Sequence, residues 1–287
     1  MTYTIFAHGG ICLLGGAALL LPLTTAADGK PGFNPVIIRG TQVAPAANPL
    51  VLAYLATFPN GSLDSSVDRL GAGAMELGDT LIPGSNPSFE PLQGAIRVGI
   101  TRPVDLSPDI IVAQSAWATK LNFGPGSVMR MKATFIAPLG PIPGGGFAIG
   151  FGAKTGGKDD LPDEPRVFAT VNVRPGFLVR LNVPFGSVEP TKMVLPTEMS
   201  DLIFSTTNPK PFTLELTIDR TNGTGQVKLM VAGQVAGPLS FHLSDFLPDS
   251  GPTITAAGAG IAVNSNGPGQ TASVAIQDFE IDTKVGG

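Results

Sequence analysis

Cysteine and histidine are nearly absent from this chain of 287 residues. The only cysteine is Cys12, and the only histidines are His8 and His242. Beyond residue 27 there is therefore no thiol, which excludes disulfide bonds from that part of the chain. A domain without disulfides depends on its hydrophobic core, and a chain of this length can bury a large one.

Charge is scarce as well. Charged residues make up 14% of the chain, and the formal net charge is −4. The sequence has no stripe of Lys and Arg that could neutralise a row of phosphates, so nucleic-acid binding is disfavoured. The segment 152–158 has the spacing of a phosphate loop, but Asp159 stands where Ser or Thr would hold magnesium. We therefore expect no nucleotide ligand.

Long stretches with the apolar spacing of a helix are also missing. The chain instead contains 37 Gly and 27 Pro, which mark turns and interrupt helices. Apolar and polar side chains alternate over residues 212–219 and again over 227–231, with Asn222-Gly223 between them as the expected hairpin turn. Similar short runs recur as far as residue 282. The pattern predicts an all-β sandwich or barrel with many strands.

The first 27 residues contain no Lys, Arg, Asp or Glu, and residues 11–23 form an apolar run that Thr-Thr-Ala-Ala follows. This arrangement predicts a secretory signal peptide over residues 1–27, cleaved after Ala26 or Ala27. An uncleaved anchor and a buried N-terminal element are the alternatives. Residues 28–49 are predicted to be a Pro-rich linker or an N-terminal strand, and residues 50–287 a single β-sandwich domain. The lack of disulfides favours a bacterial protein that is secreted or held at the cell surface.

Four segments together resemble a known superfamily. They are ATKLNFGPGSVMRMKATFIAP (118–138), GGGFAIGFGAKTGG (144–157), FTLELTIDRTNGTGQVKLMVAGQ (212–234) and VAIQDFEID (274–282). In this order they resemble the concanavalin A-like lectin/glucanase superfamily, including its LamG-like β-sandwiches. The resemblance implies a two-sheet antiparallel jelly-roll sandwich. Lectins, glycosidases, laminin-type binding modules and structural domains share this fold, so the fold alone does not fix the function.

Residues for catalysis are hard to find in the sequence. Retaining glycosidases of this fold carry acids spaced Glu-x-Asp-x-x-Glu on one strand, and Glu280-Ile281-Asp282 is the nearest match. The third acid is missing, and both carboxylates are interpreted more simply as outward-facing polar residues. His242, Asp245 and Ser250 have a protease-like order, but they lie too close together along the chain to come from separate elements. We therefore expect no catalytic residues.

Candidate binding residues are few. Asp159, Asp160, Asp163 and Glu164 lie within six residues and could supply oxygens to calcium, although a solvated acidic loop is the simpler interpretation. Trp117 is the only tryptophan and could stack on a sugar from a concave sheet face, or it could belong to the core. His242 is the other candidate ligand-binding residue, and a solvated strand position is its alternative.

These observations favour an exported, non-catalytic binding or surface-associated protein, with polysaccharide or another cell-surface component as its partner. A structural protein that self-associates by strand addition is the first alternative, with residues 29–49 as a segment that could pair with a neighbour. A glycoside hydrolase or lyase with an atypical set of acids is the second. Beyond calcium, no cofactor is expected.

Overall fold

The computed structural model describes most of the chain beyond residue 48 and four short segments before it. The described residues are 2–3, 12–14, 17–19, 38–39, 49–79, 86–105, 112–139, 145–153, 163–172, 178–182, 192–245, 253–263 and 269–284. The chain divides into two units, Met1–Asn48 and Pro49–Gly287. Among the described residues, no helix is long and apolar enough to cross a membrane.

The first unit contains two short antiparallel strand pairs. Strand β1 (Thr2–Tyr3) pairs with β4 (Ile38–Arg39), and β2 (Cys12–Leu14) pairs with β3 (Ala17–Leu19). These pairs do not test the signal peptide expected over residues 1–27, which stays a prediction.

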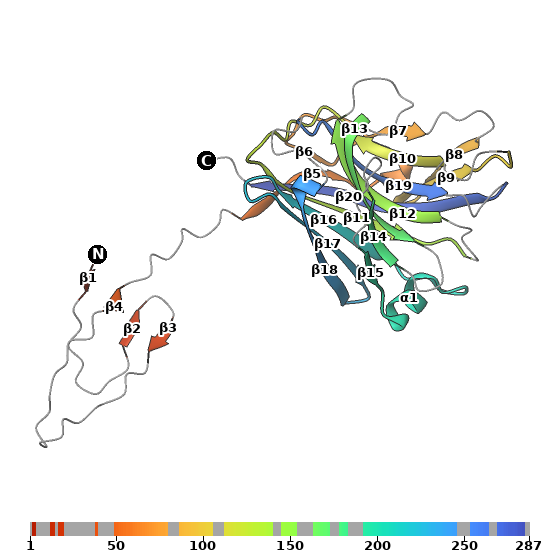
Figure 1. The fold of residues 1–287 in the computed structure, drawn as a ribbon. Helices are drawn as coiled ribbons and strands as arrows, with labels where there is room; N and C mark the ends of the chain where they lie inside the picture. The colour runs from red at the N-terminus through yellow and green to blue at the C-terminus, as the bar shows by residue number, and fades with distance from the viewer. Residues whose placement is uncertain are drawn as a thin grey trace, which may run out of the picture. The chain divides into compact units, whose positions relative to one another are not determined.

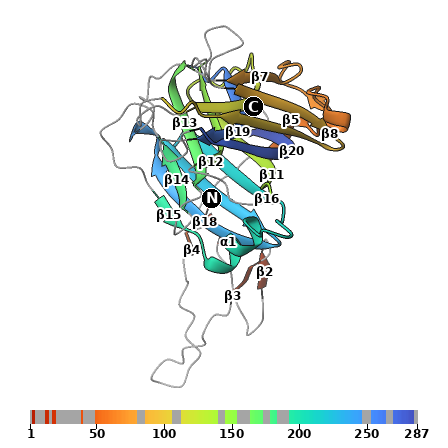
Figure 2. The ribbon, with the colours of Figure 1, turned by 90° about the vertical axis from the view of Figure 1, so that its right-hand side faces the viewer.

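The second unit is built on two large antiparallel sheets (Figures 1 and 2). The larger has nine strands. Its main path runs, in spatial order, through β18 (Gln234–His242), β17 (Thr224–Val231), β16 (Phe212–Asp219), β11 (Val128–Ile136), β20 (Thr271–Lys284), β5 (Leu50–Ala56) and β6 (Val67–Asp68). Strand β9 (Ala95–Thr101) also pairs with β20, and β8 (Asn86–Leu92) pairs with β9.

The smaller sheet has seven strands. In spatial order they are β15 (Lys192–Val194), β14 (Leu178–Asn182), β13 (Asp163–Asn172), β12 (Gly145–Ala153), β19 (Ala256–Val263), β10 (Val112–Ala118) and β7 (Glu76–Asp79). A single α-helix among the described residues, α1 (Thr197–Ile203), follows β15 and lies beside it in both views. Because strands that are distant in sequence pair in both sheets, the fold depends on long-range contacts.

The core lies between the two sheets. Alternate residues of both sheets, such as Met131 and Leu214 from the larger and Ile149 from the smaller, are fully buried in one hydrophobic cluster. Phe135 of β11 packs against Phe212 on the next strand, with ring centroids 5.4 Å apart, and against Phe147 of the opposite sheet at 6.1 Å. The expected all-β, two-sheet antiparallel sandwich is therefore confirmed.

The hairpin between β16 and β17 differs in detail from the expected tight turn. Four residues, 220–223, separate the strands, and of the pair Asn222-Gly223 only Gly223 has a positive φ, of 65°. The carboxylate of Asp219 accepts hydrogen bonds from the backbone N–H groups of Thr221 (2.9 Å) and Asn222 (3.1 Å). An Asp side chain that bonds the backbone two residues ahead stabilises a turn locally, so the loop does not need two left-handed residues.

Candidate functional site

The position of Trp117 follows from the alternation along β10. Its neighbours Ala116 and Ala118 point into the core, so Trp117 lies on the other face of the seven-stranded sheet. The indole is nevertheless only 1% exposed, and its N–H donates a 2.6 Å hydrogen bond to Ser115 Oγ. It lies against Gly258 on β19, where a Cβ atom would be 2.6 Å from the ring. In this position the indole offers no open surface on which a sugar could stack.

The structure says less about the other binding residues that the sequence suggested. His242 is exposed at the end of β18, and its role as a ligand-binding residue stays a prediction. Asp159 and Asp160 lie outside the described residues, as do the side chains of Asp163 and Glu164 at the start of β13. Calcium binding by this group stays a prediction too. No cluster of three or more potential metal ligands occurs among the residues whose side chains are described.

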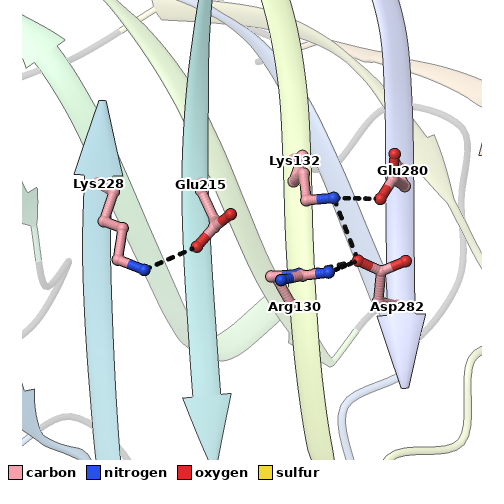
Figure 3. Close-up of polar contacts among 6 residues, drawn as sticks. All are labelled: Arg130, Lys132, Glu215, Lys228, Glu280 and Asp282. Carbon is pink, nitrogen blue, oxygen red and sulfur yellow. Dashed lines mark hydrogen bonds and ion pairs between the residues drawn. The ribbon is translucent and has the colours of Figure 1, made fainter. Parts of the chain in front are cut away.

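Glu280 and Asp282 belong to rows of charged side chains that cross the outer face of the nine-stranded sheet (Figure 3). In one row, Lys228, Glu215, Lys132 and Glu280 stand opposite one another on four consecutive strands. Lys228 Nζ lies 3.5 Å from Glu215 Oε1, and Lys132 forms an ion pair with Glu280. The signs of charge alternate across the row, as cross-strand pairing favours.

In the neighbouring row, Asp282 interacts with two cations. Arg130 donates from both Nε (2.8 Å) and Nη2 (2.5 Å) to Asp282 Oδ2, and Lys132 Nζ lies 3.2 Å from the same oxygen. Although burial alone would raise the pKa of Asp282, the hydrogen bond from Arg130 and the neighbouring cations hold that pKa below its usual range. A carboxylate stabilised in its charged form is a poor general acid. Asp282 is therefore interpreted as a structural residue, which pairs β20 with β11 through Arg130 and Lys132.

Asp278 completes a line of three carboxylates on one face of β20, and sequence reasoning missed it. It stands opposite Thr134, two residues before Glu280. Burial raises the pKa of Asp278, against the opposing effect of hydrogen bonds from Thr134. The period of two along Asp278, Glu280 and Asp282 is the signal in the sequence that could have identified the line.

A pocket opens where β11 stops pairing with β20. The last paired residues are Ile136 and Ala275, and the described part of the chain shows no partner for residues 271–274 on that side of β20. The pocket has a volume of about 350 Å³, within the range of small-ligand sites. Its apolar wall comprises Ile136, Ala137, Pro138, Leu139, Pro209, Val274 and Ala275. Its polar residues are Arg97, Thr207, Asn208 and Ser273.

The polar residues of the pocket come from three separate elements. Arg97 lies on β9 and Ser273 on β20, while Thr207 and Asn208 belong to the loop between α1 and β16. Ser205 Oγ shapes this loop by accepting hydrogen bonds from the backbone N–H groups of Asn208 (3.0 Å) and Thr207 (3.4 Å). The Asn208 side-chain amide is exposed and makes no hydrogen bond to another described residue. It is therefore available to a ligand.

Comparison with known proteins gives a likeness of fold. The sequence matches no protein-family model and no curated protein. The structure is similar to those of legume lectins. Lectin I-B4 from Griffonia simplicifolia, in a metal-free form, is 15% identical over 70% of this chain and 92% of the lectin, with a TM-score of 0.45. A Bauhinia forficata lectin in complex with GalNAc is 15% identical over 73% and 98% of the two chains, at 0.45.

Arcelin-5, a lectin-like defence protein from Phaseolus vulgaris, is 13% identical over 74% of this chain and 93% of its own, with a TM-score of 0.46. These three proteins are lectins or lectin-like, and their likeness to this chain is one of fold alone. At such low identity and TM-score, the sugars that individual lectins bind carry no argument about this chain.

Proposed function

We propose that this protein is a non-catalytic carbohydrate-binding protein that holds one part of a polysaccharide in the pocket beside β11 and β20. The observation that carries the proposal is the lining of the pocket, which combines apolar side chains with hydroxyl, amide and guanidinium groups. Sugars present apolar C–H faces and hydroxyl groups, and a site of this composition can contact both. Export to the cell surface, where a polysaccharide would be met, is part of the proposal.

The chemistry of the lining supports binding in preference to hydrolysis. Glycoside hydrolysis requires two carboxyl groups that flank the scissile bond. The described residues of the lining include no Asp, Glu, His or Cys. The three carboxylates of β20 stand opposite Thr134, Lys132 and Arg130, and those of Glu280 and Asp282 form ion pairs. Neither place offers a pair of acids arranged for bond cleavage.

Self-association by strand addition receives less support from the edges of the nine-stranded sheet. Within the described residues, β18 pairs only with β17, β8 only with β9, and the two-residue β6 only with β5. Strand β18 carries Pro238, and β8 carries Pro87 and Pro91. Proline has no backbone N–H to donate to an added strand, and natural edge strands use it to block such pairing.

The test is a glycan-array screen of the full chain, run with and without calcium, followed by titration of the best-bound oligosaccharide. Thr207 is exposed on the pocket rim, so Thr207→Trp should fill the entrance without disturbing the core. We expect affinity to fall by about tenfold or more, equivalent to roughly 1.4 kcal/mol. The matched control is Thr206→Trp, the same substitution at an exposed neighbour outside the lining, which should bind normally.

Two results would contradict the proposal. One is that no glycan binds to the folded protein under any condition. The other is that Thr207→Trp binds as well as the unchanged protein, which would place the sugar elsewhere.

A further inference from the structure

We propose that the pocket selects acidic sugars, with Arg97 binding the carboxylate of a uronic acid unit and Glu90 occupying Arg97 when the pocket is empty. This inference rests on the proposed function, because it names the class of sugar for the same site. Among the described residues that line the pocket, only Arg97 is charged.

The position of Arg97 suits a ligand in the pocket. It stands directly opposite Ala275 on β20 and opposite Glu90 on β8, in the middle of three paired strands. Ala275 and Ser273 are small, and both line the pocket with Arg97. The guanidinium therefore has a carboxylate on its β8 side and pocket-lining residues on its β20 side.

The contact between Arg97 and Glu90 is exposed and replaceable. Arg97 Nη1 lies 2.5 Å from Glu90 Oε2, and the two side chains are 45% and 56% exposed. Ion pairs this open to solvent contribute little to stability, so a second carboxylate can compete for the cation at small cost. The guanidinium has five N–H donors in a planar fork that fits a carboxylate in bidentate geometry. Glu90 engages only one of its nitrogen atoms.

The remaining polar groups suit the hydroxyl groups of the same sugar. Ser273 and Thr207 can each donate or accept a hydrogen bond, and the Asn208 amide can do both. None of the three carries a net charge, so the discrimination between acidic and neutral sugars falls on Arg97 alone.

The net charge of the chain makes this discrimination testable. A formal net charge of −4 gives no general attraction for a polyanion. Preference for an acidic oligosaccharide must therefore come from a local cation. The preference should also weaken as salt is added, because both charges at the rim are exposed.

The experiment compares trigalacturonic acid with its methyl ester, in which the same sugar units carry uncharged carboxyl groups, by isothermal titration of the full chain. We expect the free acid to bind about tenfold or more tightly than the ester. Arg97→Gln should remove the difference by weakening binding of the acid. Glu90→Gln should strengthen binding of the acid by up to about fivefold, because the competing carboxylate is gone. The matched control for Arg97→Gln is Arg69→Gln, which removes the charge of an exposed arginine outside the pocket. It should change neither the affinity for the acid nor the affinity for the ester.

The outcomes separate this inference from the proposed function. Equal binding of acid and ester by the unchanged protein would overturn the inference and leave sugar binding intact. A preference for the acid that survives Arg97→Gln would also overturn it. A folded protein that binds neither these probes nor any glycan of the array would refute the proposed function itself.

Discussion

Replacing Phe135 with alanine tests whether the two sheets share one core. Phe135 is fully buried on β11 and stacks on Phe212 of its own sheet and on Phe147 of the opposite one. Removing a buried Phe side chain typically costs about 3–5 kcal/mol, and each lost aromatic pair accounts for roughly 0.5–1.5 kcal/mol beyond simple burial. We expect a loss in this range, which is a large share of the stability of a typical domain.

The free energy of unfolding is measured by urea denaturation. Unfolding is monitored both by the fluorescence of Trp117 and by circular dichroism. Trp117 lies in the seven-stranded sheet, so its signal reports the layer opposite to the mutation. Both signals should shift together to lower urea with an unchanged slope. The matched control is Phe89→Ala on β8, where the ring is 37% exposed and the expected loss is about 1 kcal/mol. Equal losses for the two variants, or a shift seen by only one signal, would refute the shared core.

Three further substitutions test the sheet face and one close contact. Asp282→Asn should lower the free energy of unfolding at pH 7 by about 1–2 kcal/mol. Because the folded pKa of Asp282 is lowered, the difference from the unchanged protein should shrink as pH falls below about 4, which urea titrations across pH would show. Asp278→Asn should instead raise stability at pH 7, since the raised folded pKa of Asp278 means that its ionised form is disfavoured; a clear loss would contradict this. Gly225→Ala should lower the free energy of unfolding by about 1–3 kcal/mol, because the new Cβ would meet the Phe241 ring at 2.0 Å. The loss should appear as a lower melting temperature. An unchanged melting temperature would show that the Phe241 ring moves freely.

The fold was largely predictable from the sequence because period-two alternation reports directly which strand face is buried. Residues 212–219 and 227–231 became β16 and β17 with their apolar residues in the core, as expected. The pairing order was not predictable in the same way. Strand β20 is last in sequence yet lies inside its sheet, between β11 on one side and β5 and β9 on the other. Which strands become neighbours is set by long-range packing, and local sequence patterns do not report it.

The pocket could not be foreseen, because no motif marks it. Its lining comes from four stretches of chain that meet only after folding, around residues 97, 136–139, 207–209 and 273–275. One signal was present, since Arg97 interrupts the apolar run of 95–100 and must therefore face outward. Trp117 shows the opposite difficulty. Alternation placed it on one face or the other, but its burial against Gly258 depends on a glycine well over one hundred residues away in the chain.

The most direct test of the account is to locate the bound sugar by two-dimensional NMR of the labelled full chain. The oligosaccharide that binds best in the array is titrated while the backbone amide signals are followed. We expect the largest shifts at Thr207, Asn208 and Ser273, which line the pocket, and little change at Ser115 or Trp117 on β10. Shifts confined to the seven-stranded sheet, with the pocket amides unmoved, would contradict the proposed site.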